Sequence, residues 1–386
     1  MILLSVVFGV TFAVHYYLWN RLVKAPAWPA PYKRVGTTLL VLLGSSIPLG
    51  FLGSRLLGRE TAMPLSWLAF IWMGVMFLLV VLLLPSELAR LGLWVRERRN
   101  KDEDGIAAPE RRQFLSRAIA AGTLSGSAGL SSYALFSGLR PVAIKPVPVT
   151  LRRGAPGLSG FKIVQMTDIH VGPTIGRGFI EQLVQKTNDL EPDLIAITGD
   201  LVDGSVDALR THVAPLADLR ARHGVFFVTG NHEYYSDKES WVAHLESLGI
   251  RVLKNENVTL EHDGATLTVA GVHDYQSDRF GDVSDVAVAL EGADPDRPVL
   301  LLAHQPKNID AAREAGVDLQ ISGHTHGGQI FPFNYLVHLQ QPFVAGFHQL
   351  GDTALYVSRG TGYWGPPMRL GSPAEITEIV LSPPAV

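Results

Sequence analysis

The chain has 386 residues, and at about 150 residues per domain this length predicts two or three folding units. Hydrophobic residues make up 47% of the chain and charged residues only 18%, which predicts that part of it lies in a membrane. The formal net charge of −3 provides no basic field, so no nucleic-acid partner is expected. Because cysteine is absent, disulfides, thiolate metal sites and a cysteine nucleophile are excluded.

Three long uncharged stretches lie near the N-terminus. Residues 1–20, 35–54 and 61–86 contain no Asp, Glu, Lys or Arg. Each is long enough to cross about 30 Å of hydrocarbon as an α-helix. We therefore predict three transmembrane helices.

A fourth uncharged stretch, residues 118–139, is rich in Gly, Ala and Ser and only mildly apolar. It follows Arg111 and Arg112, and this prefix resembles a twin-arginine export signal, whose apolar segment is also weak. Two arginines are equally typical of the cytoplasmic end of a transmembrane helix. Both interpretations place Arg111 and Arg112 in the cytoplasm.

The basic residues between these stretches predict their orientation. The loops after the first and third predicted helices hold four and eight Lys or Arg residues, whereas the loop after the second holds two. Basic loops mark the cytoplasmic side, so the N-terminus is expected outside. If residues 118–139 cross the membrane, everything after Pro141 lies outside; if they do not, the C-terminal part is cytoplasmic. We favour crossing, which predicts a multi-pass protein of a bacterial-type inner membrane with its C-terminal domain on the outer side.

The chain changes character after this predicted membrane region, residues 1–140. Prolines at positions 141, 146 and 148 predict an extended linker over residues 141–150. Over residues 151–386, short apolar runs alternate with amphipathic stretches, which predicts an α/β domain. The expected strands are residues 161–167, 193–198, 224–229, 266–272, 298–303, 317–322, 354–358 and 375–381. The expected helices are residues 179–190, 206–221, 239–248 and 308–315.

Polar side chains follow five of the predicted strands. In chain order they are Asp168 and His170, then Asp200 and Asp203, then Asn231 and His232, then His304, and finally His324 and His326. Open α/β sheets bind ligands beyond the carboxyl ends of their strands. In the Asp-x-His and His-x-His pairs, alternate side chains of an extended chain point the same way, so each pair can grip one ion.

This ordered set resembles the calcineurin-like metallophosphoesterases, whose pattern is D-x-H, G-D-x-x-D, G-N-H-[DE], H and G-H-x-H. The resemblance covers about residues 161–381, and the run GHTHGGQ with the segment 358–371 is similar to the membrane-anchored branch of that superfamily. It implies a four-layer αββα sandwich, placed here after a bundle of three or four transmembrane helices.

The resemblance also implies a centre of two divalent metal ions. In that family pattern, the first ion would bind Asp168, His170 and His326, the second would bind Asn231, His304 and His324, and Asp200 would bridge them. Oxygen and nitrogen ligands without sulfur suit Mn, Fe or Zn. Two such ions can hold a bridging hydroxide that attacks phosphorus in line, so we expect a metal-dependent phosphoric ester hydrolase.

The family pattern gives His232 and Asp203 a role beyond metal binding. By resemblance, His232 protonates the leaving oxygen or stabilises the phosphorus, and Asp203 orients its ring. In the protein Ser/Thr phosphatase branch an arginine follows the second aspartate, whereas this chain has Gly204 there. This departure disfavours a phosphoprotein substrate and leaves phosphodiesters, pyrophosphates and lipid-linked phosphates as candidates.

Two late arginines, Arg359 and Arg369, are candidates for binding the substrate phosphate. Residues 330–347 are rich in aromatic side chains and form either core or a loop that reaches lipid. One alternative function is that of a UDP-2,3-diacylglucosamine pyrophosphatase-like enzyme of glycolipid synthesis, which would need a cytoplasmic site. An alternative of another class is a catalytically silent, metal-stabilised receptor or binding domain.

Overall fold

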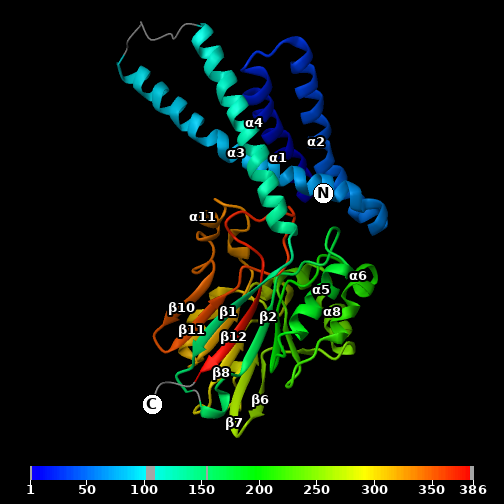
Figure 1. The fold of residues 1–386 in the computed structure, drawn as a ribbon, viewed down its shortest axis with the longest axis vertical. Helices are drawn as coiled ribbons and strands as arrows, with labels where there is room; N and C mark the ends of the chain where they lie inside the picture. The colour runs from blue at the N-terminus through cyan, green and yellow to red at the C-terminus, as the bar shows by residue number, and fades with distance from the viewer. Residues whose placement is uncertain (1, 101–108, 154, 383–386) are drawn as a thin grey trace. The chain divides into compact units, whose positions relative to one another are not determined.

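The computed structural model describes residues 2–100, 109–153 and 155–382. The predicted membrane region begins at Met1 and the predicted α/β domain ends at Val386, and both of these residues lie outside the described ranges. The chain separates into two compact units (Figure 1). One comprises residues 1–139 with Gly365–Met368, and the other comprises Arg140–Trp364 with residues 369–386.

The first unit is helical, and its helices cover all four predicted stretches. They are α1 (Ile2–Leu18), which continues as a π-helical turn over Trp19–Lys24, α2 (Ala30–Leu56), α3 (Arg59–Asn100) and α4 (Pro109–Leu139). Among the described residues, two segments are long and apolar enough to cross a membrane, Ala30–Ser54 and Arg59–Arg96. The spans expected at residues 1–20 and 118–139 stay predictions.

Helix α4 is packed through small side chains. Its buried positions are spaced three or four residues apart and are all Ser, Thr or Ala: Ser116, Ala120, Thr123, Ser127, Ser131, Ala134 and Ser137. Small residues on one face allow helix backbones to approach closely without a large apolar contact area. This explains why α4 packs in the unit although its composition is only mildly apolar.

The second unit contains two mixed six-stranded sheets, with strand orders β1-β12-β2-β3-β4-β5 and β10-β11-β9-β8-β7-β6. The first sheet is formed by β1 (Ala143–Thr150), β2 (Lys162–Met166), β3 (Leu194–Thr198), β4 (Val225–Val228), β5 (Arg251–Val252) and β12 (Glu375–Ser382). The second is formed by β6 (Glu256–His262), β7 (Ala265–Gly271), β8 (Val299–Leu302), β9 (Leu319–Ser322), β10 (Gly346–Leu350) and β11 (Thr353–Val357). The eight predicted strands are confirmed to within two residues at each end.

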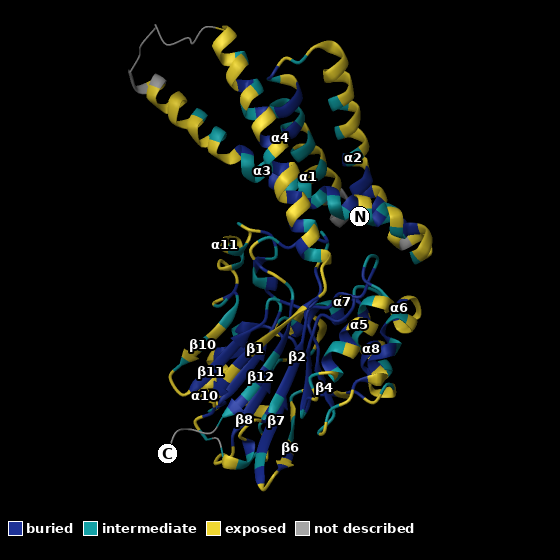
Figure 2. Cartoon of the chain, in the orientation of Figure 1, coloured by how far each residue is buried: buried dark blue, intermediate teal, exposed yellow. Residues whose placement is uncertain are grey.

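Three apolar clusters define the layers of this unit. The central cluster joins side chains of both sheets, such as Ile163 and Leu302, so the sheets pack face to face. The other face of the first sheet packs against α5 (Arg177–Asn188), α6 (Val206–Val213) and α8 (Lys238–Ser247). The other face of the second packs against α9 (Val286–Ala289) and α10 (Ile309–Glu314). The inner strands of both sheets are therefore buried, whereas the edge strands β1, β6 and β10 keep exposed residues (Figure 2).

Shorter helical elements connect these layers. They are α7 (Asn231–Tyr235), α11 (Asn334–Val337) and 3₁₀ turns at Pro156–Leu158, Ala214–Asp218, Ser277–Phe280, Pro306–Asn308 and His326–Gly328. The helix expected over residues 206–221 ends at Val213, and Pro215 lies in the 3₁₀ turn that follows. The aromatic stretch 330–347 contains α11 and the start of β10.

The structure differs from the linker prediction for residues 141–150. Ala143–Thr150 is strand β1, which pairs in parallel with β12 along its whole length. An edge strand tolerates proline because backbone N–H groups on its free side need no partner in the sheet. Pro146 and Pro148 can therefore belong to a paired strand, and the alternate residues Val147 and Val149 are buried.

Candidate metal centre

The predicted polar residues converge because five strands end at one rim of the sandwich. Strands β2, β3 and β4 of the first sheet run parallel to one another, as do β8 and β9 of the second. The loops after these five strands carry the nine predicted ligand and catalytic side chains. Each sheet thus supplies part of the site.

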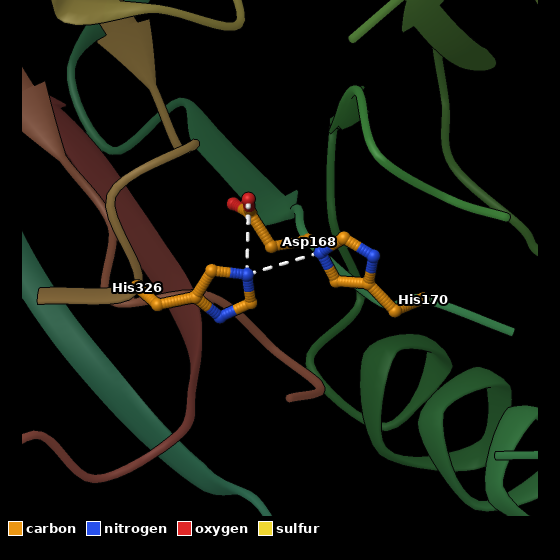
Figure 3. A group of neighbouring side chains, drawn as sticks. All are labelled: Asp168, His170 and His326. Carbon is orange, nitrogen blue, oxygen red and sulfur yellow. Dashed lines mark hydrogen bonds and ion pairs between the residues drawn. The ribbon is translucent and has the colours of Figure 1, made fainter. Parts of the chain in front are cut away.

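The first group of ligand-type side chains contains Asp168, His170 and His326 (Figure 3). The Nε2 atoms of His170 and His326 lie 3.0 Å apart, and His326 Nε2 lies 3.6 Å from Asp168 Oδ1. All three residues are buried. This spacing would allow one cation to contact all three side chains.

A second group contains Asp200, His304 and His324. His304 Nε2 lies 3.1 Å from Asp200 Oδ2 and 3.2 Å from His324 Nδ1. The same Asp200 oxygen is 3.9 Å from His170 Nε2 in the first group. Asp200 therefore lies between the two groups.

A third group links Asp203 to two imidazoles. Asp203 Oδ1 lies 2.5 Å from His232 Nδ1 and 3.1 Å from His170 Nδ1. A carboxylate that accepts from Nδ1 fixes the tautomer and orientation of a ring. Nε2 is then the nitrogen of His170 and His232 that remains for chemistry, and His232 Nε2 is 4.0 Å from Asp200 Oδ2.

The backbone of these loops is held in an uncommon conformation. Five site residues have positive φ angles between 50° and 70°: Asp168, His170, Asp200, His324 and His326. Such strain costs of order 1–3 kcal/mol per residue and persists only where the surroundings impose it. Glycines permit the close approach, since a Cβ at Gly230 would collide with the Asp200 carboxylate and one at Gly323 with Asp168.

Glu233 is a site residue that the sequence reasoning did not assign. Its completely buried carboxylate accepts the backbone N–H groups of Gly230, Asp200 and Leu201 at 2.7–3.0 Å, and that of Val202 at 3.3 Å. Burial and the nearby Asp200 carboxylate raise the pKa of Glu233 to about 7. Glu233 thus links the loop after β3 to the loop after β4 through hydrogen bonds. Its position as the last residue of the G-N-H-[DE] pattern is the sequence feature that could have identified it.

Three observations fit a metal at this rim. The Asn231 side-chain oxygen is buried without a hydrogen-bond partner in the described structure, an arrangement that costs about 1–3 kcal/mol unless another group satisfies it. Burial and His304 lower the pKa of His324 to about 3, and burial and His170 hold the pKa of His326 well below its usual range. Neutral imidazoles offer the lone pairs that metal binding requires.

The two arginines predicted to bind substrate are placed differently. Arg369 is completely buried, and its guanidinium donates to the carbonyls of His326, Arg359 and Ser372. Its Nη2 also lies 3.3 Å from His326 Nδ1. Arg369 therefore stabilises the loop of His326. The sequence had instead predicted that it contacts the substrate phosphate.

Arg359 remains partly exposed. Its guanidinium is 3.3 Å from the Glu375 carboxylate, and its side chain lines a cavity of about 400 Å³ together with Gly327 and Phe331. Because Gly327 directly follows His326, this cavity begins one residue from the metal centre. Arg359 thus remains a candidate to contact substrate.

The chain is similar in sequence to known proteins. The family model for calcineurin-like phosphoesterases matches residues 161–328. The chain is 46% identical over 265 residues to a Bos taurus transmembrane protein with metallophosphoesterase domain, covering 65% of this chain and 60% of that protein. It is 35% identical over 380 residues to the Danio rerio protein of the same name, covering 95% and 85%. It is 38% identical over 278 residues to an uncharacterized metallophosphoesterase of Helicobacter pylori, covering 71% and 73%.

We predict that Glu233→Gln weakens metal binding at least tenfold, as expected when a partner that orients ligands is lost. The glutamine would direct an NH₂ donor at backbone N–H groups and release the β3 loop that carries Asp200. Metal titration followed by calorimetry measures the change. Glu239→Gln alters an exposed glutamate and serves as the matched control. Unchanged metal affinity in Glu233→Gln would contradict the role assigned to this carboxylate.

Proposed function

The chain belongs to the calcineurin-like phosphoesterase family of metal-dependent phosphoester hydrolases, and we propose that it hydrolyses a phosphodiester, a pyrophosphate or a lipid-linked phosphate at a centre of two divalent ions. The observation that carries this proposal is the position of Asp200 between two groups of buried ligand-type side chains. A shared anion relieves the repulsion between two neighbouring dications, which is the role we propose for Asp200.

Each proposed ion would take ligands from the loops of both sheets. Asp168, His170 and His326 would hold one ion, and Asn231, His304 and His324 the other. The oxygen and nitrogen donors favour Mn, Fe or Zn, and the buried Asn231 oxygen is otherwise unsatisfied. When bound, two such ions would supply a nucleophile from water and neutralise charge on the phosphoryl oxygens.

We propose His232 as the general acid, oriented by Asp203. The Asp203 contact occupies Nδ1, so Nε2 is the nitrogen that can donate to a leaving oxygen. Burial lowers the pKa of His232, but the Asp200 and Asp203 carboxylates outweigh it and raise the pKa to about 9. The Asp203 carboxylate thus favours the protonated ring, which is the form that an acid catalyst needs.

The loop after Asp203 and the membrane region support a proposal for the substrate class. Gly204 stands where the protein phosphatases have an arginine, so the loop after Asp203 provides no cation for a phosphoprotein. Large apolar side chains of the helical unit face outward, including Phe12, Val41 and Leu42. With two candidate spans and relatives named as transmembrane proteins, these features support membrane association and favour a substrate that is itself held at the membrane.

The metal centre is tested by Asp200→Asn. Loss of the shared negative charge should reduce bound metal and lower hydrolysis of bis-p-nitrophenyl phosphate at least a hundredfold, while the fold survives because the change is isosteric. Elemental analysis and initial rates with Mn measure both effects. Asp207→Asn on the exposed face of α6 is the matched control. Full activity of metal-free Asp200→Asn protein would refute a dinuclear centre.

The general acid is tested by His232→Ala. This variant should retain its metals and lose about 10²- to 10⁴-fold in turnover of esters with poor leaving groups. The loss should be smaller for p-nitrophenolate, which departs without a proton, and Asp203→Asn should show the same pattern more weakly. Equal losses for both substrates would assign His232 to stabilisation of the phosphoryl oxygens, and loss of metal would show that His232 is a ligand.

For localisation, we propose that the catalytic unit lies on the outer side of a bacterial-type inner membrane. The basic loops on either side of the predicted spans support this orientation. A β-lactamase fused after Val386 should therefore be active against ampicillin in intact cells, because it protects the cell wall only from outside the cytoplasm. Replacing Arg111 and Arg112 by Lys should abolish that activity if the twin-arginine route is used and preserve it if they act as a charge anchor. An inactive fusion in the unmodified protein would place the catalytic unit in the cytoplasm.

A further inference from the structure

Exposed aromatic side chains adjoin the proposed general acid. The His232 ring lies 5.5 Å from the ring of Tyr235 and 5.9 Å from that of Trp364, measured between centroids. Tyr235 is 58% exposed and Trp364 is 56% exposed, whereas His170, which contacts His232 on the metal side, is buried. The imidazole thus has metal ligands on one side and accessible apolar rings on another.

The aromatic surface extends beyond these two rings. Phe280 lies 5.9 Å from Tyr235 and is also about half exposed. Tyr235 ends helix α7, Phe280 ends the 3₁₀ turn Ser277–Phe280 and Trp364 lies between β11 and β12, so only the fold brings them together beside His232. A contiguous exposed apolar surface at a reaction centre is typical of a ligand contact.

Trp364 is held in place from the metal-binding loop. The Gln329 side chain donates from Nε2 to the Trp364 carbonyl and accepts from the Trp364 N–H, both at 3.0 Å. The Gln329 backbone N–H in turn donates to the carbonyl of the ligand His326. These bonds link the backbone of Trp364, which carries the indole, to the loop of His326.

The position of the rings identifies the part of the substrate that they would meet. His232 Nε2 lies toward Asp200 and would protonate the leaving oxygen. The group attached to the leaving oxygen would therefore lie close to the imidazole and its neighbours. A charged phosphate would gain little from aromatic rings, whereas an apolar hydrocarbon or ring would be removed from water against them.

We propose that Tyr235, Phe280 and Trp364 form a subsite for an apolar group attached directly to the leaving oxygen, with Gln329 as its positioning residue. This inference rests on the proposed function and deepens it. It favours a phosphodiester with a ring or hydrocarbon leaving alcohol over a pyrophosphate, whose leaving oxygen carries a second, charged phosphate.

Competitive inhibition of bis-p-nitrophenyl phosphate hydrolysis by the detergent-solubilised full chain with Mn tests the subsite. The inhibitors are methyl benzyl, methyl cyclohexylmethyl and methyl 2-methoxyethyl phosphate, which have the same charge and differ in apolar surface. The first two should bind about tenfold more tightly than the third, as expected for burying one ring. Tighter binding of the benzyl ester would indicate an aromatic leaving group, and equal or tighter binding of its saturated counterpart a hydrocarbon one.

Variants assign this preference to the named side chains. Trp364→Ala and Tyr235→Ala should weaken the two apolar inhibitors about tenfold and the methoxyethyl ester less than twofold. Tyr235→Phe keeps the ring and Phe347→Ala removes an exposed ring from strand β10, so both should retain the preference. Equal inhibition of the wild type by all three esters, or equal weakening of all three in Trp364→Ala, would overturn the proposal.

Gln329→Ala should lose the apolar preference and keep its metal content, since its side chain holds Trp364 and its backbone bond to the His326 carbonyl remains. A fall in kcat and metal content with the preference intact would instead show that Gln329 only stabilises the loop of His326. Failure of the proposed function has a different signature. In that case the wild-type chain with Mn would not hydrolyse bis-p-nitrophenyl phosphate at all.

Discussion

Keeping two carboxylates buried at the rim of the sandwich is the constraint on which the site depends. Asp168 and Asp200 are almost completely inaccessible, and a buried charge is costly unless hydrogen bonds or opposite charges compensate it. Both Asp168 oxygens accept the His324 backbone N–H, at 2.9 and 3.0 Å, and Asp200 accepts that of His232. Although burial raises the pKa of Asp200, His304 and His232 hold it well below its usual range. A pair of dications would complete this compensation.

The loops around the site place backbone N–H groups and imidazoles next to these two carboxylates. The left-handed backbone at five site residues turns the loops so that N–H groups and imidazoles face the carboxylates. Glu233 and Arg369 act on the backbone of these loops. Glu233 accepts hydrogen bonds from backbone N–H groups, and Arg369 donates hydrogen bonds to backbone carbonyls. Neither contacts substrate in our proposal, yet each fixes a loop that carries a proposed ligand. The strain of these loops is sustained by two sheets that pack through a continuous apolar cluster.

The rim of this centre is chemically asymmetric. On one side lie the ligand-type side chains of both sheets, and on another lie exposed aromatic rings beside His232. A cavity lined by Arg359 and Phe331 opens next to the loop of His326. Charge compensation and apolar contact are therefore available within one site, which is what an ester of phosphate and an apolar alcohol requires. The helical unit adds outward-facing apolar side chains that suit a membrane.

Sequence patterns were sufficient for the elements whose signal is local. Apolar runs predicted eight strands, and polar residues directly after five of them predicted which side chains would meet, because parallel strands end at the same edge of a sheet. The family pattern implies a division of ligands between two ions, which stays a proposal. The helices over all four N-terminal stretches also followed from composition, and among the described residues two of them meet the length and hydropathy expected of a span.

Other features depended on partners distant in the chain, and only the tertiary structure decided them. Residues 141–150 read as a linker because their prolines are a local signal, whereas pairing with β12 is a contact across more than two hundred residues. The sequence predicted that Arg369 binds phosphate, whereas in the structure it is buried and donates to backbone carbonyls. No sequence pattern indicated a role for Trp364, which lies beside His232 only in the folded domain. Periodicity and motif spacing report which residues are buried or polar. They do not report which distant groups surround them, because that is set by packing of the whole domain.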